Sequence, residues 1–363
     1  MTILMTGSTG FLGKAVVERL CVSGASPIRC LVRPNSDLSS LNEIQSRYPA
    51  AQIEYVVGNL LSAKQAYDAT KGAEMVIHLA AETRGLPSTV FANTVVASKN
   101  LLEGVVRHRV RRVVLVSSLS VYGVASLPRG TVVTEETLLE ENPEARDVYS
   151  FSKVRQDRLF QEYRTRHPFE LVILRPGVLY GDGCKSWPSR AGLRLGAAVL
   201  EIAGRNQVPF TNVNSCAAAV AMAGGLDRLP EGFYNVIDDD LLKVTEYVGL
   251  YHKLVEPVVR LRIPFCLAIP FSFLLEQLHI LSRKQVPLLL SPYRLRTMWG
   301  GHVFSNQKLK AHGWKPVVAT REGVVRALCS VSDTNLSRLT EYDVTAPSGS
   351  PLASTEELAA RST

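Results

Sequence analysis

The sequence predicts an α/β protein with a doubly wound parallel sheet and a smaller C-terminal lobe. Three observations predict this fold class. Short apolar runs alternate with helical patterns through the first half of the chain, a glycine-rich turn follows the first run, and polar or glycine-containing segments follow the later runs. Strands that alternate with helices form βαβ units and therefore a parallel sheet.

Six apolar runs are the predicted strands of this sheet. The first begins at Thr2 and leads into the glycine-rich turn, and the others are Ile28–Val32, Ile53–Val57, Met75–Leu79, Val113–Val116 and Leu171–Leu174. The helices predicted between them include Ala97–Val106 and Val148–Arg164. Ligands of such sheets bind at the carboxyl ends of the strands. The residues that follow each strand are therefore the first candidates for a binding site.

The pattern loosens after Val178, which predicts a second, smaller unit. Its expected elements are a Gly/Pro-rich loop over Gly181–Pro188, a helix over Leu193–Ala203, a strand near Val208–Val213, a helix from Ser215 and a strand over Phe233–Ile237. We assign residues 1–177 to the core, to which elements return from 205–240, and residues 178–345 mainly to a substrate-binding lobe. Residues 346–363 are rich in Ser, Ala and Pro without apolar periodicity, so a disordered tail is expected there.

The segment Val258–Leu281 allows three interpretations. From Ile263 onward it is nearly all apolar, with Pro264, Pro270 and Glu276 inside it. A membrane-spanning helix needs about 20 apolar residues without such breaks. We therefore favour a buried or lobe-covering helix over peripheral membrane contact through residues 258–281, and both over a true span.

Composition and charge restrict the classes of partner. The 363 residues carry a formal charge of +8, but the basic residues are spread along the chain, so nucleic-acid binding is not expected. A mild positive field suits a phosphorylated cofactor or an anionic surface, and a basic surface without a partner explains it equally well. The six cysteines lack the spacing of metal ligands, so they are predicted to be reduced thiols in a cytoplasmic protein, and no metal site is expected.

The first turn predicts a dinucleotide site. Gly7, Gly10 and Gly13 are spaced G-x-x-G-x-x-G between the first strand and an amphipathic helix that begins near Phe11. Glycines let the loop approach a pyrophosphate closely, while the helix directs its free N–H groups and positive dipole end toward that group. An ordinary strand-to-helix turn is the alternative, but the position of the motif favours nucleotide binding.

Three further residues predict proton transfer beside a hydride transfer. Tyr149 and Lys153 are four residues apart on a predicted helix and share a face, and Ser118 follows the fifth strand. A phenol is a poor base at neutral pH. A neighbouring ammonium and a positive nicotinamide ring both favour the phenolate, so Tyr149 is expected to titrate nearer neutrality. A Tyr and a Lys on a solvated helix face are the alternative.

With these motifs the chain resembles the extended short-chain dehydrogenase/reductase family, also called the NAD-dependent epimerase/dehydratase family, over about Thr2–Leu328. The resemblance implies a Rossmann-type core and a catalytic triad of Ser118, Tyr149 and Lys153. Arg175-Pro176-Gly177 and Tyr180 match the family segment that shapes the nicotinamide and substrate pocket. It also implies a homodimer packed through the helices Ala97–His108 and Val148–Arg164.

The predicted contacts follow from these matches together with the residue patterns. Cofactor contacts are expected from Gly7, Thr9, Gly10, Phe11, Leu12, Gly13, Arg33, Asn59, Leu60, Ala80, Ala81, Ser117, Tyr149, Lys153, Pro176, Gly177 and Val178. Substrate contacts are expected from Thr83, Ser118, Leu119, Ser120, Tyr149 and Tyr180. Asn93 matches a helix start that supports the family's site, but its spacing to Asn100 is one residue longer than usual.

The end of the second strand indicates the cofactor. A carboxylate there would bind a ribose diol and reject a 2′-phosphate, but the strand ends in Arg33-Pro34 with no acid before Asp37. Arg33 could pair with a 2′-phosphate or stack on adenine. NADP(H) is therefore favoured, and NAD(H) stays open.

Three functions remain. The favoured one is an NAD(P)-dependent oxidoreductase that acts on a ketone or secondary alcohol of a bulky, sterol-like or sugar-like small molecule, because the apolar second half resembles the 3β-hydroxysteroid dehydrogenase-like branch. The first alternative is a nucleotide-sugar epimerase with resident NAD. The second alternative is a non-catalytic module that senses NADP(H), although such a module has no need of Ser118, Tyr149 and Lys153.

Overall fold

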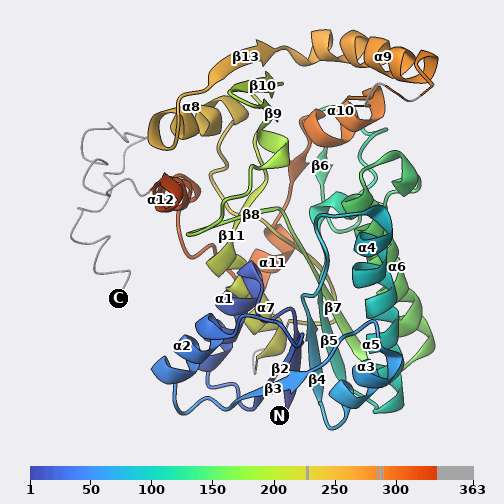
Figure 1. Cartoon of the computed structure of the whole chain (residues 1–363), viewed down its shortest axis with the longest axis vertical. Coiled ribbons are helices and arrows are strands. Elements are labelled where there is room, and N and C mark those ends of the chain that lie inside the picture. Colours follow the sequence, from blue (N-terminus) through green and yellow to red (C-terminus); the bar gives the residue numbers. More distant parts are fainter. Residues whose placement is uncertain (226–228, 284, 286–287, 289, 333–363) are drawn as a thin grey trace.

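A seven-stranded parallel sheet forms the centre of the computed structural model (Figure 1), which describes residues 1–225, 229–283, 285, 288 and 290–332. The strand order is β12-β7-β5-β4-β1-β2-β3. The strands are β1 (Ile3–Thr6), β2 (Ile28–Val32), β3 (Ile53–Val57), β4 (Met75–His78), β5 (Arg112–Val116), β7 (Glu170–Pro176) and β12 (Gly232–Val236). The order reverses beside β1, and such a reversal opens a crevice at the carboxyl ends of the strands. This is the predicted doubly wound, Rossmann-type sheet.

Helices cover both faces of the sheet. One face is covered by α1 (Phe11–Val22), α2 (Ser39–Arg47) and α7 (Val213–Gly224); the other is covered by α3 (Ala63–Thr70), α5 (Ala97–Arg107) and α6 (Val148–Arg166), with α4 (Pro87–Phe91) beside α6. Alternate residues of β1 enter the two layers: Ile3 and Met5 pack on the α1 side and Leu4 on the α5 side. Burial on both faces explains why the strands are continuous apolar runs.

The predicted strands and core helices are confirmed within two residues at each end. Ile28–Val32 and Ile53–Val57 match β2 and β3 without a difference. The helix predicted from Ser215 is α7, which begins two residues earlier. The two helices of the predicted dimer contact, α5 and α6, lie on the same face of the sheet, and the dimer itself stays a prediction.

The second unit holds small sheets and helices above the carboxyl edge of the core (Figure 1). Its strands are β8 (Val178–Tyr180), β9 (Leu193–Leu195), β10 (Ala198–Ile202), β11 (Phe210–Asn212), β13 (Val259–Ile263) and β14 (Val303–Phe304), and β14 pairs with β6 (Val132–Val133), which comes from the first 177 residues. Its helices are α8 (Val244–Leu254), α9 (Phe265–Leu281), α10 (Pro292–Trp299), α11 (Gln307–Ala311) and α12 (Thr320–Ser332). The boundary at 177/178 therefore falls between β7 and β8, and the tail predicted at 346–363 lies outside the described residues.

The helix predicted over Leu193–Ala203 is wrong: this segment is the hairpin β9–β10. Leu195 pairs with Ala198, so Gly196 and Ala197 form a two-residue turn. Gly196 has φ of +60°, a conformation that such turns require and that glycine adopts without strain. A short apolar run does not distinguish a strand from a helix by periodicity alone, and here the glycine turn decides.

The segment Val258–Leu281 is not one buried helix. It forms the edge strand β13 and then, after Pro264, the helix α9, in which only Ala268 and Ser272 are buried. Along the described part of the chain, no helix combines the length and the apolar character that crossing a bilayer requires. The buried-helix interpretation is therefore wrong, while α9 does cover the outer end of the lobe (Figure 1).

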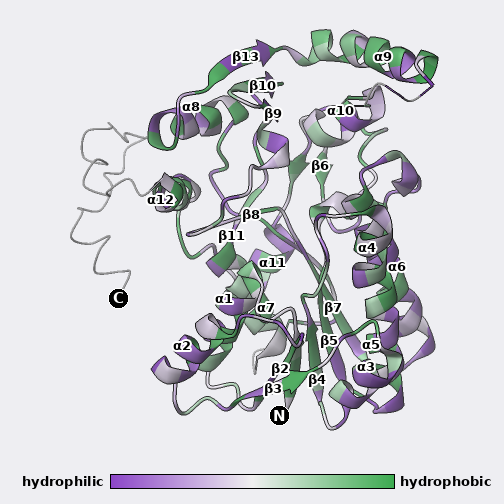
Figure 2. Ribbon diagram, viewed as in Figure 1, coloured by the Kyte–Doolittle hydropathy of each residue, from purple (hydrophilic) through white to green (hydrophobic). Residues whose placement is uncertain are grey.

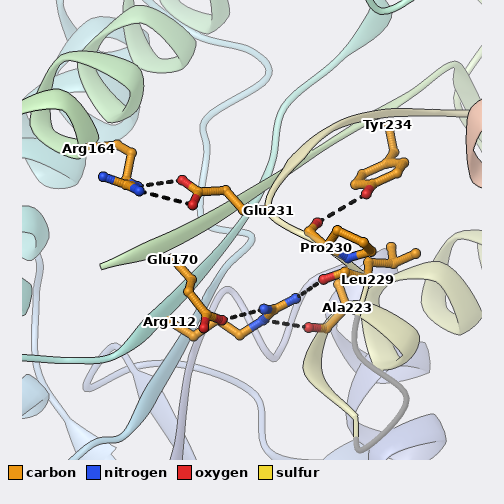
Figure 3. A network of polar contacts seen from close by, with 8 residues as sticks. All are labelled: Arg112, Arg164, Glu170, Ala223, Leu229, Pro230, Glu231 and Tyr234. Carbon is orange, nitrogen blue, oxygen red and sulfur yellow. Dashed lines mark hydrogen bonds and ion pairs between the residues drawn. The ribbon is translucent and has the colours of Figure 1, made fainter. Parts of the chain in front are cut away.

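Arg112 anchors the strand that returns from the lobe to the sheet (Figure 3). Its buried guanidinium donates to the carbonyl of Ala223 at 2.9 Å and to that of Leu229, and it pairs with the Glu170 carboxylate at 2.6 Å. Nearby, Arg164 of α6 pairs with Glu231 immediately before β12. These contacts join α6, α7, β5 and β7 at the edge opposite the carboxyl ends, and so hold β12 as the last strand.

Gly13 is expected to tolerate no side chain, because a Cβ there would lie 2.0 Å from the Gly7 carbonyl oxygen. Gly13→Ala should lower the free energy of unfolding by about 1–3 kcal/mol, measured by urea denaturation. Gly224→Ala is the matched control in a second helix, since its Cβ would meet only side chains at 3.4 Å. There the better helix propensity of alanine should leave stability unchanged or slightly raised. Equal effects of the two variants would contradict the close approach.

Candidate active site

The β1–α1 turn forms the floor of a groove at the carboxyl ends of β1, β2 and β4. Gly7 has φ of +76°, and a Cβ on it would lie 2.8 Å from the backbone nitrogen of Ala80. Gly10 precedes α1, and no side chain caps the helix at this end. The first N–H groups of α1 therefore stay available to an anion at the positive end of the helix dipole.

The groove contains eight of the predicted cofactor residues. Its lining includes Gly7, Thr9, Gly10, Arg33, Asn59, Leu60, Ala80 and Ala81. Three other predicted residues of this turn do not line it. Leu12 and Gly13 are buried in α1, and Phe11 is exposed, with its ring beside Gly181 of the lobe. These three residues set the position of α1.

Arg33 and Asn59 lie at the rim of the groove. The Arg33 backbone N–H donates to Ser36 Oγ at 3.1 Å, while its exposed guanidinium makes no ion pair or hydrogen bond with any described residue. Asn59 Oδ1 accepts from the N–H of Leu61 at 2.9 Å, and Gln65 Oε1 accepts from the Asn59 N–H. The Asn59 side-chain oxygen therefore shapes the turn, which leaves its side-chain NH₂ group as a donor toward a ligand.

Nine residues of the groove were not among the predicted cofactor contacts. They are Thr6, Leu31, Val32, Ser36, Gly58, Leu79, Glu82, Asn93 and Ala97. The extra residue between Asn93 and Asn100 is accommodated by a π-helical turn over Ala92–Val96, between α4 and α5. A π turn takes up one residue more than an α turn and is frequent at functional sites. Asn93 therefore lines the groove. Its unusual spacing to Asn100 was the sequence signal for the π-helical turn.

The capped start of α6 positions Tyr149. Asp147 precedes the helix and accepts hydrogen bonds from the Ser150 N–H and Oγ, each at 2.9 Å. This cap fixes Tyr149 in the first helical turn, beside the end of β5. Ser118 lies close enough to the Tyr149 phenol to lower its pKa as a hydrogen-bond partner, and Ser118 Oγ accepts from the Ser120 N–H at 3.1 Å. The predicted pair of Tyr149 and Ser118 is therefore in contact.

Lys153 lies one turn further along α6 and is almost completely buried. Its Nζ donates to the Val116 carbonyl at 2.8 Å and to Gln156 Oε1 at 2.5 Å. Burial lowers the Lys153 pKa to about 7, and the charge of Asp157 opposes this shift. Gln156 in turn contacts Ser98 and His78, and these two side chains are hydrogen-bonded to each other.

The Tyr149 pKa moves in the direction opposite to the one expected from sequence. Burial raises the pKa of this phenol, the hydrogen bond with Ser118 opposes the shift, and the charge of Asp147 adds to it. The Lys153 ammonium does not lower the Tyr149 pKa in the protein alone, because it is directed toward Val116 and Gln156.

A buried ion pair connects α6 with two strands. Arg175 of β7 donates two parallel hydrogen bonds to the Asp157 carboxylate, at 2.9 and 3.1 Å, and Asp157 also accepts from Ser117 Oγ at 2.6 Å. The third arm of the guanidinium donates to the Tyr122 hydroxyl, which donates to Asn235 of β12. Ser117 was predicted to contact the cofactor, but its hydroxyl is occupied by Asp157.

The other predicted residues lie where core and lobe meet. Pro176 ends β7, and a Cβ on Gly177 would lie 2.0 Å from the Pro209 carbonyl oxygen. Val178 begins β8 and donates its N–H to the same carbonyl. Thr83 is exposed in the loop after β4, where the next residue, Arg84, donates to Ser186 Oγ of the lobe at 3.0 Å.

Three predicted substrate residues belong at least partly to the packing of the protein. Leu119 is buried in a cluster with Tyr122 and Val154. The Tyr180 hydroxyl donates to Asp238 Oδ2 at 2.8 Å, and its ring packs in the core of the lobe. Ser120 is half-buried, and its Oγ has no hydrogen-bond partner among the described residues. Of the three, Ser120 keeps a polar atom without a partner.

The groove fits a nicotinamide dinucleotide in two respects. The approach of Gly7 to Ala80 leaves no room for a side chain, and the uncapped end of α1 suits a pyrophosphate. Gly7, Gly10 and the start of α1 would hold the phosphates, and Arg33 and Asn59 would face the adenosine end. Among the described residues, no cluster of three or more His, Cys, Asp or Glu side chains could hold a metal ion.

The comparisons with known proteins agree with this geometry. The model of the NAD dependent epimerase/dehydratase family matches residues 3–234. The 3beta-hydroxysteroid-dehydrogenase/decarboxylase isoform 1 of Arabidopsis thaliana is 25% identical over 367 residues, covering 94% of this chain and 82% of that protein. The UDP-glucose 4-epimerase of Vibrio cholerae is 27% identical over 194 residues, covering 51% of this chain and 54% of that protein.

Solved structures share the fold. The UDP-glucose 4-epimerase of Thermus thermophilus in complex with NAD has a TM-score of 0.65 at 20% identity, over 91% of this chain and 99% of that one. The dTDP-glucose 4,6-dehydratase DesIV of Streptomyces venezuelae, with NAD and TYD bound, has a TM-score of 0.68 at 20% identity, over 92% and 97%. The family match extends from β1 to β12, and so the chain belongs to the NAD dependent epimerase/dehydratase family, the extended short-chain dehydrogenase/reductase enzymes.

Proposed function

We propose that the protein is an NAD(P)-dependent oxidoreductase that interconverts a ketone and a secondary alcohol on a bulky, apolar substrate of the sterol type. The observation that carries the proposal is the contact between Tyr149 and Ser118 at the end of β5, one helical turn from the buried Lys153. A phenol, a hydroxyl and a lysine side chain that lie together at the carboxyl edge of the sheet support this proposal.

Each side chain has one role in the proposed reaction. Tyr149 donates its phenolic proton to the substrate oxygen during reduction and takes the proton back during oxidation. Ser118 orients the same oxygen through a hydrogen bond. Lys153 favours the phenolate when it is charged, and its pKa of about 7 lets it gain or lose a proton near neutrality. A bound nicotinamide supplies or accepts the hydride.

The extent of the sequence similarity supports a sterol-like substrate. The likeness to the Arabidopsis thaliana 3beta-hydroxysteroid-dehydrogenase/decarboxylase covers 94% of this chain, and therefore includes the lobe. The likeness to the Vibrio cholerae epimerase covers 51%. Because specificity in such proteins depends on loops and lobes added to a shared core, similarity in the lobe is the better guide to the substrate.

Arg33 supports a preference for NADP(H). Its guanidinium lines the groove at the end of β2 and has no partner among the described residues. A planar guanidinium can donate two parallel hydrogen bonds to a phosphate, whereas a ribose diol offers it no charge.

Tyr149→Phe is expected to reduce turnover by about a hundredfold to about ten-thousandfold, because it removes the proton donor. Turnover would be followed by nicotinamide absorbance with a panel of hydroxysteroids and bulky apolar ketones, and NADPH binding should stay close to that of the wild type. Tyr163→Phe is the matched control, since it removes a hydroxyl from another tyrosine of α6. Turnover retained in Tyr149→Phe would contradict the proposed acid.

Arg33→Asp is expected to change the ratio of the NADPH and NADH dissociation constants by about tenfold to about a hundredfold in favour of NADH. Fluorescence titration of both cofactors measures the ratio. Arg19→Asp makes the same charge change at the exposed far end of α1 and should leave the ratio unaltered. A preference unchanged in Arg33→Asp, or changed equally in both variants, would show that Arg33 does not read the 2′-phosphate.

A nucleotide-sugar epimerase with a resident NAD is the second candidate, favoured by the similarity to the Vibrio cholerae epimerase. Protein purified without added cofactor would be denatured and the released nucleotide identified by chromatography. Net redox chemistry predicts an empty protein, because the cofactor must exchange at each turnover. Stoichiometric NAD⁺ would instead support the epimerase.

A further inference from the structure

Helix α9 lies at the end of the molecule opposite the N-terminus, next to the edge strand β13 (Figure 1). Only one narrow face of α9 packs on the lobe. Ala268 and Ser272 are buried, and Phe265, Ile269 and Leu275 are partly buried against a cluster that contains Leu295 and Trp299. These positions recur at spacings of three and four residues, as the packed stripe of a helix does.

Most of α9 is hydrophobic (Figure 2), and its exposed side is as apolar as its packed stripe. Its side chains at helical spacing are Leu267, Phe271, Leu274, Leu278 and Leu281, with exposed fractions between 45% and 77%. We call these five residues the α9 apolar face. A helix at the surface of a water-soluble domain normally carries polar residues on its outer side, and contiguous exposed apolar patches mark interaction sites.

Cations border this face. Arg262 in β13 is 68% exposed and shares the buried Glu201 carboxylate with Arg260, so this cluster of two arginines and one acid keeps a net positive charge; Arg283 follows the C-terminus of α9 and is exposed as well. Val259 and Leu261 of β13 add exposed apolar surface before Arg262. From Val259 to Arg283 the chain holds three arginines and a single acid, the half-buried Glu276. The combination of an apolar helix face with basic residues beside it is the pattern of segments that lie in a membrane interface.

We propose that the α9 apolar face docks the protein on an anionic lipid surface, with Leu267, Phe271 and Leu274 inserted among the acyl chains and Arg262 and Arg283 at the level of the lipid phosphates. The charge pattern favours lipid over a second copy of this chain. A two-fold contact would repeat the same arginines on both sides of the interface, where they repel, whereas an anionic surface neutralises them. The inference is independent of the proposed reaction.

Flotation of the full-length protein with vesicles tests the proposal. Vesicles of phosphatidylcholine and phosphatidylglycerol should carry the protein upward, and those of phosphatidylcholine alone should carry much less. Phe271→Glu/Leu274→Glu should reduce the bound fraction about tenfold or more. Val22→Glu/Val132→Glu is the matched control. It adds the same charges outside the α9 apolar face, at side chains that are 55% and 56% exposed, and it should bind like the wild type.

A second variant separates charge from insertion. Arg262→Gln/Arg283→Gln should weaken binding to the anionic vesicles and reduce its sensitivity to salt, because exposed charges are screened. Absence of wild-type binding to both kinds of vesicle would overturn the proposal, as would equal loss in the two double-Glu variants. A dimer in sedimentation experiments that Phe271→Glu/Leu274→Glu dissociates would assign the face to a second copy instead.

Discussion

The buried ion pair between Asp157 and Arg175 is the interaction on which the candidate site depends. Both side chains are almost fully buried, and the guanidinium meets the carboxylate through two hydrogen bonds. Breaking such a pair by removing one partner costs about 3–5 kcal/mol, because it leaves an unpaired charge inside the protein. The pair fixes α6 against β5 and β7, and α6 carries Tyr149 and Lys153.

The same pair also extends to the lobe. The Arg175 guanidinium packs on the rings of Tyr122 and Phe233. The Tyr122 hydroxyl in turn donates a hydrogen bond to Asn235 of β12. The Asn235 side chain donates to the Ser305 carbonyl at 3.1 Å, in the segment that follows β14. A continuous set of polar contacts thus runs from α6 to the segment that follows β14. Networks of this kind are stable only when each member is satisfied, which explains why so many polar side chains are buried here.

The core could be predicted from sequence because local and global signals agree there. The strands are continuous apolar runs, and close backbone contacts require the glycines of the first turn. Both features can be recognised in the sequence. The hairpin β9–β10 could not be separated from a helix by its apolar residues, and the decision depended on the φ of Gly196. Tyr180 matched a family position, but its hydroxyl is held by Asp238, a partner 58 residues away. Long-range pairing of this sort leaves no local pattern.

Burial makes the protonation of Lys153 sensitive to the charge of a group that binds beside it. Burial brings the Lys153 pKa to about 7, so near neutrality the ammonium and the neutral amine are populated to similar extents. A hydroxyl or anion placed near Nζ would favour the ammonium and raise this pKa. By linkage, the ligand then binds more tightly at pH values where Lys153 is already charged. The ammonium so stabilised would favour the phenolate of Tyr149, which burial otherwise disfavours. Burial thus disfavours the phenolate in the protein alone, and a ligand that charges Lys153 would act in the opposite direction.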